Sequence, residues 1–365
     1  MKIGFVAEPY EETNASGMGY VVMELMKNLP LGAGDTLTIY SSKPVSRDLV
    51  RQPFVNVLVP KGFFGKLFYF FKLKPEVDVL LFIAPLLPLV INKKIHAVQV
   101  CQELGSQKTP VSGLRESTVA FLRDRLLMPI SLKRASAVIA ASYATKTDIH
   151  TYYAVPDEKV VVVYDGYQDL TIYEGNAPAI DPALKPFFYF AGKVKGRKNV
   201  HGIVEGFIKF KKRIASNVKL VIAGDYGGVY YEDMKIKIEE SGLGSEVFFP
   251  GYTVGAQHYT YYKNALALVF PSFNEGFGMP PVEAMSLGLP VITSNLSSMA
   301  EVVADAGLLV NPHDSDDISH AMEKIYTDQA LREELIKKGY MRAKDFSWTK
   351  AAGEVMAVLQ KVAKK

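Results

Sequence analysis

Cysteine is almost absent from this chain: its 365 residues include a single one, Cys101. One cysteine cannot form an internal disulfide, which excludes the disulfide-stabilised scaffolds of small secreted domains. Charge of one sign is also scarce, because 42 Lys and Arg face 38 Asp and Glu. An excess of four charges is too small for a nucleic-acid-binding protein, so we expect no nucleic-acid partner. The length and the hydrophobic content of 48% favour two globular domains, each large enough to bury a core.

Long hydrophobic runs are missing as well. The longest uncharged apolar stretch, residues 79–92, is shorter than the roughly 20 residues that span a bilayer, and it contains two prolines. Near the start of the chain, Glu8 interrupts the apolar region that a signal peptide would need. The sequence therefore predicts no membrane-spanning segment and a cytoplasmic protein.

Short apolar runs alternate with helical patterns along most of the chain. Fully apolar strands spaced by helices are typical of parallel sheets covered on both faces. This alternation is interrupted at residues 168–186, which contain three prolines and are typical of an interdomain linker. We predict two doubly wound α/β domains in tandem, with a ligand site in the cleft at the carboxyl ends of their strands. The predicted strands are 2–7, 77–84, 95–100, 135–142 and 159–166 before this break, and 187–192, 218–224, 246–252, 265–272, 290–295 and 306–311 after it.

The most specific motif is FPSFNEGFGMPPVEAMSLGLPVITSN, residues 270–295. Its apolar start predicts a strand, and its paired prolines begin a short helix, which places Glu275 at the strand end and Glu283 in the first helical turn. Gly276 and Gly278 allow the backbone to approach a ligand closely. Both carboxylates can accept hydrogen bonds from a polyhydroxylated ligand such as a sugar. The alternative is that Glu283 only complements the helix dipole and that Glu275 is solvated.

This segment resembles the E-x7-E signature of the retaining glycosyltransferases of family 4, and weaker similarity covers nearly the whole chain. The resemblance implies the GT-B fold, in which two Rossmann-like domains face each other across a cleft. It implies an acceptor-side domain at 1–168, a linker at 169–186, a domain for the nucleotide-sugar at 187–345, and a helix at 346–365 that packs back toward the first domain.

The resemblance also implies roles for residues of the motif. Glu275 would contact hydroxyls of the donor sugar, and Glu283 would hold the ribose of the nucleotide. Main-chain amides of Gly276, Phe277, Gly278 and Met279 would contact the sugar and the phosphate.

A second motif, FFYFAGKVKGRKNV at residues 187–200, is basic. It places Lys193 and Lys198 after a predicted strand. Negative charge grows on a departing diphosphate, and preorganised cations stabilise it. Family 4 enzymes usually carry Arg and Lys at these two positions, so Lys193 keeps the charge but lacks the bidentate guanidinium. Arg197 is a donor-binding candidate, and its guanidinium would compensate for the one that is missing at position 193. The alternative is a solvated basic loop.

Two glycines, Gly17 and Gly19, lie where the first strand passes into its helix. Their N–H groups can face a diphosphate, while the alternative is a plain tight turn. A dinucleotide-binding fingerprint is incomplete, because Val22 replaces the third glycine.

One departure from the family bears on the mechanism. Family members usually carry a His just after the strand that matches 95–100, where this chain has Gln102 and Glu103. Gln102 can donate a hydrogen bond to a sugar hydroxyl but cannot act as an acid or a base near neutral pH. His96 is expected in the strand itself, and the other histidines lack metal-ligand spacing, so we expect no metal and no other cofactor.

An aromatic and basic segment, residues 61–75, contains four lysines and no acid. Such a helix can lie in a lipid interface, which would suit a lipid-linked acceptor at the inner face of the plasma membrane. Alternatively it is an ordinary crossover helix with solvated lysines. Residues 1–168 carry 19 Lys and Arg against 15 Asp and Glu, so the whole charge excess lies in this half. The membrane or acceptor candidates are Lys61, Phe63, Phe64, Lys66, Phe70 and Lys72.

We therefore expect a metal-independent retaining hexosyltransferase that uses a nucleotide-diphosphate sugar and a saccharide or lipid-linked acceptor in cell-surface polysaccharide or glycolipid synthesis. In the front-face mechanism favoured for the family, the leaving phosphate accepts the proton of the acceptor, which suits a site without a His base. The alternatives are a nucleotide-sugar 2-epimerase of the same fold and a glycosyltransferase-like binding protein that has lost catalysis.

Overall fold

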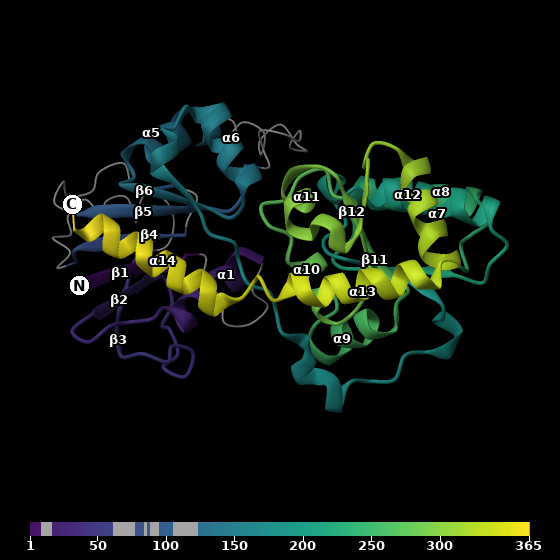
Figure 1. The fold of residues 1–365 in the computed structure, drawn as a ribbon, viewed down its shortest axis with the longest axis horizontal. Helices are drawn as coiled ribbons and strands as arrows, with labels where there is room; N and C mark the ends of the chain where they lie inside the picture. Colours follow the sequence, from purple (N-terminus) through teal and green to yellow (C-terminus); the bar gives the residue numbers. More distant parts are fainter. Residues whose placement is uncertain (9–16, 61–76, 84–85, 88–94, 105–122, 365) are drawn as a thin grey trace. The chain divides into compact units, whose positions relative to one another are not determined.

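The chain forms two compact units, Met1–Gly166 with Ser347–Lys365, and Tyr167–Phe346 (Figure 1). The computed structural model describes residues 1–8, 17–60, 77–83, 86–87, 95–104 and 123–364. Residues 169–186, which the sequence marks as a linker, are part of the second unit and form two short 3₁₀ helices, Leu170–Asn176 and Pro182–Leu184. Leu170 is fully buried there, so this stretch is packed against the unit.

The first unit contains a seven-stranded parallel sheet in the order β3-β2-β1-β4-β5-β6-β7. All five strands predicted in this half are present, and β4 and β6 are buried along their whole length. Two further strands, β2 and β3, complete one edge of the sheet. The strands are β1 (Lys2–Val6), β2 (Thr36–Ser41), β3 (Phe54–Leu58), β4 (Val79–Phe82), β5 (His96–Cys101), β6 (Ala137–Ala140) and β7 (Val160–Val162). The helices include α1 (Gly17–Asn28), α5 (Met128–Arg134) and α6 (Tyr143–Tyr153).

The second unit contains a six-stranded parallel sheet in the order β10-β9-β8-β11-β12-β13. All six strands predicted here are present: β8 (Phe187–Ala191), β9 (Lys219–Ala223), β10 (Val247–Gly251), β11 (Ala267–Phe270), β12 (Val291–Ser294) and β13 (Leu308–Val310). The helices are α7 (Val200–Arg213), α8 (Gly228–Glu240), α9 (Gly255–Asn264), α10 (Met279–Ser286), α11 (Ser297–Val303), α12 (Ser315–Thr327) and α13 (Gln329–Ala343).

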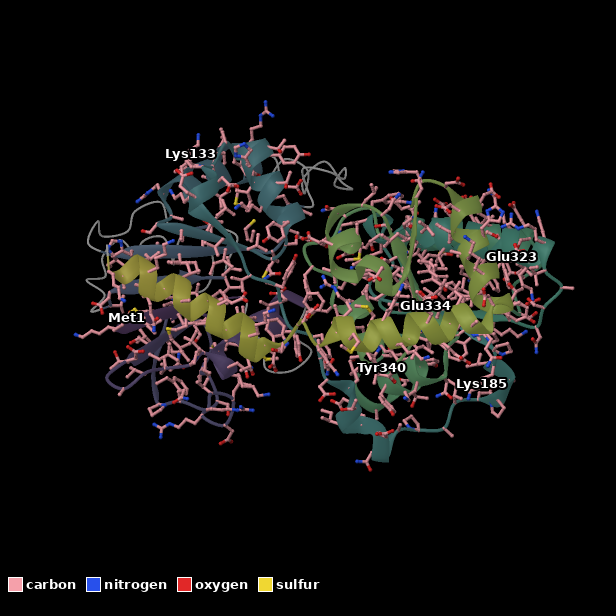
Figure 2. All side chains as sticks on the ribbon, in the orientation of Figure 1. Met1, Lys133, Lys185, Glu323, Glu334 and Tyr340 are labelled. Carbon is pink, nitrogen blue, oxygen red and sulfur yellow. The ribbon has the colours of Figure 1, made fainter. Side chains whose placement is uncertain are left out.

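Apolar side chains fill the space between each sheet and its helices (Figure 2). The whole of β8 is buried, as expected for the central strand of a doubly wound sheet. Charged side chains such as Lys133 and Glu334 lie on the exposed sides of their helices (Figure 2). Each unit therefore has its own hydrophobic core.

The last helix, α14 (Trp348–Ala363), returns to the first unit, where it contacts α1, β4, β5 and β6 (Figure 1). Ser347 caps its amino terminus by accepting a hydrogen bond from the N–H of Lys350. Trp348 lies so close to Gly166 that a Cβ at Gly166 would sit 2.5 Å from the backbone nitrogen of Trp348. The prediction that the C-terminal helix crosses back to the first domain is confirmed.

Among the described residues, none of the helices combines the length and the apolar character that a bilayer crossing requires. The aromatic and basic segment lies outside the described residues, so its contact with a membrane or a lipid-linked acceptor stays a prediction. This applies to Lys61, Phe63, Phe64, Lys66, Phe70 and Lys72.

Candidate active site

The topology of the second sheet marks where a ligand is expected. The strand order reverses between β8 and β11, and ligands of doubly wound sheets bind beyond the carboxyl ends of the strands at such a switch point. The loop after β8 carries Lys193, Arg197 and Lys198, and the loop after β11 carries Glu275. Residues nearly eighty positions apart are therefore brought to one edge of the sheet.

The loop after β11 leads into α10 through Gly278, the N-cap residue, which has φ +95°. This backbone angle favours glycine, and a Cβ at Gly278 would also displace the methyl group of Met299. The helix begins at Met279, with Pro280 in its first turn. Glu283 is therefore the fifth residue of α10, at the start of the second turn and just past the first turn that the sequence predicts.

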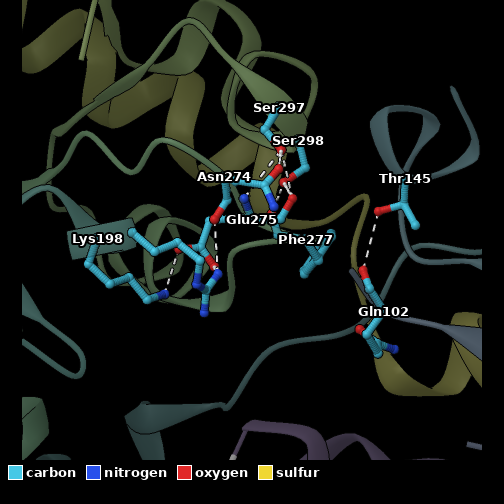
Figure 3. A network of polar contacts seen from close by, with 9 residues as sticks. Gln102, Thr145, Lys198, Asn274, Glu275, Phe277, Ser297 and Ser298 are labelled. Atoms are coloured by element: carbon cyan, nitrogen blue, oxygen red, sulfur yellow. Dashed lines mark hydrogen bonds and ion pairs between the residues drawn. The ribbon is translucent and has the colours of Figure 1, made fainter. Parts of the chain in front are cut away.

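Glu275 is buried, with 7% of its surface exposed, and it binds two cations. Lys198 Nζ lies 2.6 Å from Oε1 (Figure 3). Arg197 Nη1 lies 3.1 Å from Oε2. Burial alone would raise the pKa of Glu275, but the charges of Lys198 and Arg197 outweigh it and lower that pKa below its ordinary value. The carboxylate is thus ionised and paired, which excludes the alternative of a solvated Glu275.

The structure does not bring Lys193 to this pair. Its Nζ lies 3.6 Å from Asp225 Oδ2, and both side chains are 60% exposed, so the ion pair contributes little to stability. The short 3₁₀ helix Gly196–Lys198 turns Arg197 and Lys198 toward Glu275 instead. Arg197, expected only to compensate, is therefore the second cation on the glutamate.

Asn199 fixes the turn that follows these two cations. Its backbone is left-handed, with φ +56°, and its side-chain oxygen accepts a hydrogen bond from the N–H of Gly202 at the start of α7. Its Nδ2 donates to the carbonyl oxygens of Pro271, at 3.2 Å, and Pro312, at 2.7 Å. Because Pro271 opens the loop of Glu275, this amide ties the two loops together.

Two serines at the start of α11 hold the backbone of the Glu275 loop (Figure 3). Ser297, which has φ +57°, places its Oγ 2.8 Å from the carbonyl oxygen of Glu275 and accepts from its N–H at 3.2 Å. Ser298 Oγ lies 3.0 Å from the same carbonyl and 3.2 Å from that of Phe277. No motif signals these serines in the sequence. The ring of Phe277 is buried, so only its main chain can serve a ligand.

Glu283 is also buried, with 6% of its surface exposed. Tyr262 Oη donates to its Oε2 at 3.0 Å, and His258 Nε2 lies 3.9 Å from the same oxygen. Burial and the charge of Glu283 raise the pKa of Tyr262, so the phenol keeps the proton that it donates. Within the described part of the chain, the other oxygen, Oε1, accepts no hydrogen bond.

In the first unit, Gln102 follows β5 and is half-buried, whereas Glu103 is exposed. Gln102 Nε2 donates to Asp165 Oδ1 at 3.2 Å. The main-chain carbonyl oxygen of Gln102 accepts from Thr145 Oγ1, also at 3.2 Å (Figure 3). Burial raises the pKa of Asp165 to about 7, although the hydrogen bond from Gln102 opposes this shift. Asp165 belongs to the predicted strand 159–166, and nothing in the sequence signals that its carboxyl is buried.

The two glycines expected at the first turn are the first and third residues of α1: Gly17 is exposed and Gly19 is buried. Their position at a helix amino terminus agrees with the prediction, and whether they face a diphosphate stays a prediction. Among the described residues, no group of three or more His, Cys, Asp or Glu side chains could hold a metal ion.

Comparison with known proteins finds a family model that matches most of the second unit. The model of the family "Glycosyl transferases group 1" matches residues 180–342. O-antigen chain mannosyltransferase B of Escherichia coli is 29% identical over 226 residues, which are 60% of this chain and 58% of that protein. O-antigen chain mannosyltransferase RfbU of Salmonella typhimurium is 31% identical over 247 residues, 64% of this chain and 65% of that protein. The chain thus matches less than two thirds of the length of either relative.

Solved structures agree on the fold over almost the entire chain. Sucrose-phosphate synthase from Thermosynechococcus elongatus aligns with a TM-score of 0.75 at 19% identity, covering 99% of this chain and 98% of that one. WaaG, a glycosyltransferase involved in lipopolysaccharide biosynthesis, aligns with a TM-score of 0.71 at 15% identity, covering 98% of this chain and 99% of that one. The chain has the GT-B fold, and its residues 180–342 match the model of the family of glycosyl transferases group 1.

Proposed function

We propose that the protein is a retaining glycosyltransferase that moves a hexosyl unit from a nucleotide-diphosphate sugar to a saccharide or lipid-linked acceptor. The observation that carries this proposal is the buried Glu275 carboxylate with Lys198 and Arg197 at the switch point of the second sheet. The relatives named as O-antigen chain mannosyltransferases support a place in cell-surface polysaccharide or glycolipid synthesis. A solved structure of similar fold, HepE from Anabaena, is described in complex with UDP-glucose.

In this proposal the second unit binds the donor. The ionised carboxylate of Glu275 accepts hydrogen bonds from sugar hydroxyls, and the amides of residues 276–279 contact the sugar and the phosphate. Glu283 accepts from the ribose through Oε1, the oxygen that Tyr262 does not occupy. The serine contacts beneath Glu275 support this role, because they fix the loop before the ligand arrives.

The reaction step in the proposal is the departure of the nucleoside diphosphate. As the glycosidic bond breaks, negative charge grows on the leaving oxygen, and Lys198 and Lys193 stabilise it. Lys198 already contacts Glu275, and the exposed side chain of Lys193 can turn from Asp225 toward a phosphate. The proton of the acceptor hydroxyl goes to the departing phosphate, so the front-face route needs no enzyme base and no metal. Gln102 and Glu103 are proposed to meet the donor sugar from the first unit.

The test begins with a screen of UDP-, GDP-, ADP- and dTDP-sugars by thermal shift, followed by product analysis by NMR. Release or transfer of the sugar distinguishes an enzyme from a binding protein, and the anomeric configuration of the product tests retention. We then expect Lys198→Ala to lower kcat by about 10²–10³-fold with little change in the KM for the acceptor. The exposed Lys195 of the same loop is the matched control, and Lys195→Ala should retain activity. A near-wild-type kcat for Lys198→Ala contradicts the assignment.

A further inference from the structure

Beneath Glu283 lies a buried polar cluster that the E-x7-E motif does not contain. Tyr262, on α9, is 1% exposed and donates to Glu283 Oε2 at 3.0 Å. Behind it, His258 Nδ1 lies 2.9 Å from Thr253 Oγ1 and 3.2 Å from Tyr189 Oη. The cluster joins β8, the loop after β10 and α9 to the one carboxylate.

Distances decide which member of the cluster holds the carboxylate. The 3.9 Å between His258 Nε2 and Glu283 Oε2 is too long for a hydrogen bond, whereas 3.0 Å for Tyr262 is well within range. Tyr262 Oη also lies 3.4 Å from the carbonyl oxygen of Pro280, but its single proton goes to the nearer and charged acceptor. Tyr262 is therefore the side chain that fixes Glu283.

The consequence is an asymmetric carboxylate. One oxygen is engaged from inside the unit, and the other accepts nothing from the described residues. A carboxylate fixed in this way presents one acceptor in a fixed direction, which matches a pair of vicinal hydroxyls better than a freely rotating group does.

We propose that Tyr262 is a positioning residue that orients Glu283 Oε1 toward the ribose diol of a nucleoside diphosphate, and so sets the preference for ribose over dideoxyribose, which lacks this diol. This inference rests on the proposed ribose-binding role of Glu283. It adds a residue that the family signature does not carry, on a helix that no motif marks.

The neighbouring tyrosine provides a matched control. Tyr261 precedes Tyr262 on α9 and stacks on Tyr189 with ring centroids 5.4 Å apart. In the described part of the chain its hydroxyl makes no hydrogen bond, so Tyr261→Phe removes an equivalent oxygen from the same helix without touching Glu283. Tyr262→Phe keeps the ring and its packing and removes only the donor.

The experiment measures binding of UDP, GDP and ADP, and of their 2′,3′-dideoxy analogues, by isothermal titration calorimetry. We expect the wild type and Tyr261→Phe to bind the best ribonucleotide about 10–100-fold more tightly than its dideoxy analogue. Tyr262→Phe should lose most of this preference, because its affinity for the ribonucleotide falls while that for the analogue stays the same.

Each other outcome has a separate meaning. If the wild type does not distinguish ribose from dideoxyribose, the ribose role of Glu283 fails, and the inference fails with it. A wild-type preference that Tyr262→Phe retains overturns the inference alone. If Tyr262→Phe binds the ribonucleotide and its dideoxy analogue equally more weakly than the wild type does, the inference is also overturned, because that result indicates a general structural defect.

Discussion

Replacing Asp165 by Asn should make the first unit more stable and should remove one component of its pH dependence. The carboxyl is 6% exposed, and its pKa rises from an ordinary value near 3.8 to about 7 in the folded chain. Between these values the folded protein binds a proton that the unfolded chain has released. The stability from this proton is fully present below about pH 4 and is lost as the pH rises through 7.

The size of the effect follows from the two pKa values. A difference of about three pKa units corresponds to about 4 kcal/mol over the whole range, at about 1.4 kcal/mol per unit. Between about pH 6 and pH 8.5 the wild type should lose about 1.4 kcal/mol more unfolding free energy than Asp165→Asn. The amide oxygen of Asn can still accept the hydrogen bond from Gln102, so the geometry is conserved.

Trp348 provides the assay, because it is the only tryptophan of the chain and it lies against Gly166 in the first unit. Urea unfolding followed by its fluorescence reports on this unit in a chain that need not unfold in one step. Asp157→Asn is the control, since the Asp157 side chain is 74% exposed and pairs only with Lys146 among the described residues. An equal stability difference between wild type and Asp165→Asn at every pH would refute the assignment of a protonated, buried carboxyl.

Two further predictions concern the backbone around the candidate site. Gly224→Ala should destabilise the second unit by at least about 3 kcal/mol, measured by thermal unfolding, because Gly224 has φ +146° and an added Cβ would overlap the carbonyl oxygen of Gly192. Asn199→Ala should cost about 2 kcal/mol through the lost helix cap and the lost bonds to Pro271 and Pro312. Asn199→Gly tolerates the left-handed backbone, so a fully stable Asn199→Gly would contradict this account.

Most of the strands that the sequence predicts are buried along nearly their whole length, and their apolar runs are continuous. The two that it misses, β2 and β3, lie at one edge of the first sheet. In β3, Val55 and Leu58 are 63% and 58% exposed, and Asn56 interrupts the apolar run. An edge strand needs no continuous apolar pattern, so its sequence does not stand out from a loop.

The candidate site was predictable where one contiguous motif contains both the residue and its structural context. The motif at 270–295 places Glu275 after a strand and Glu283 on a helix without further information. The choice of Arg197 over Lys193 as partner of Glu275 depends on a three-residue 3₁₀ turn, whose direction the spacing of basic residues does not fix. Tyr262 lies 21 residues from its partner, on a different helix, and only the folded chain shows the contact.

The return of α14 to the first unit has a consequence for the order in which the chain can fold. The second unit is one continuous stretch, so its core needs no residues from elsewhere in the chain. The first unit lacks the inward face of α14, including Ala352, Val355 and Leu359, until the whole second unit has been synthesised. Until then the sheet of the first unit exposes an apolar surface. We therefore expect this unit to complete its folding more slowly than the second unit and to be the more prone to aggregate during synthesis.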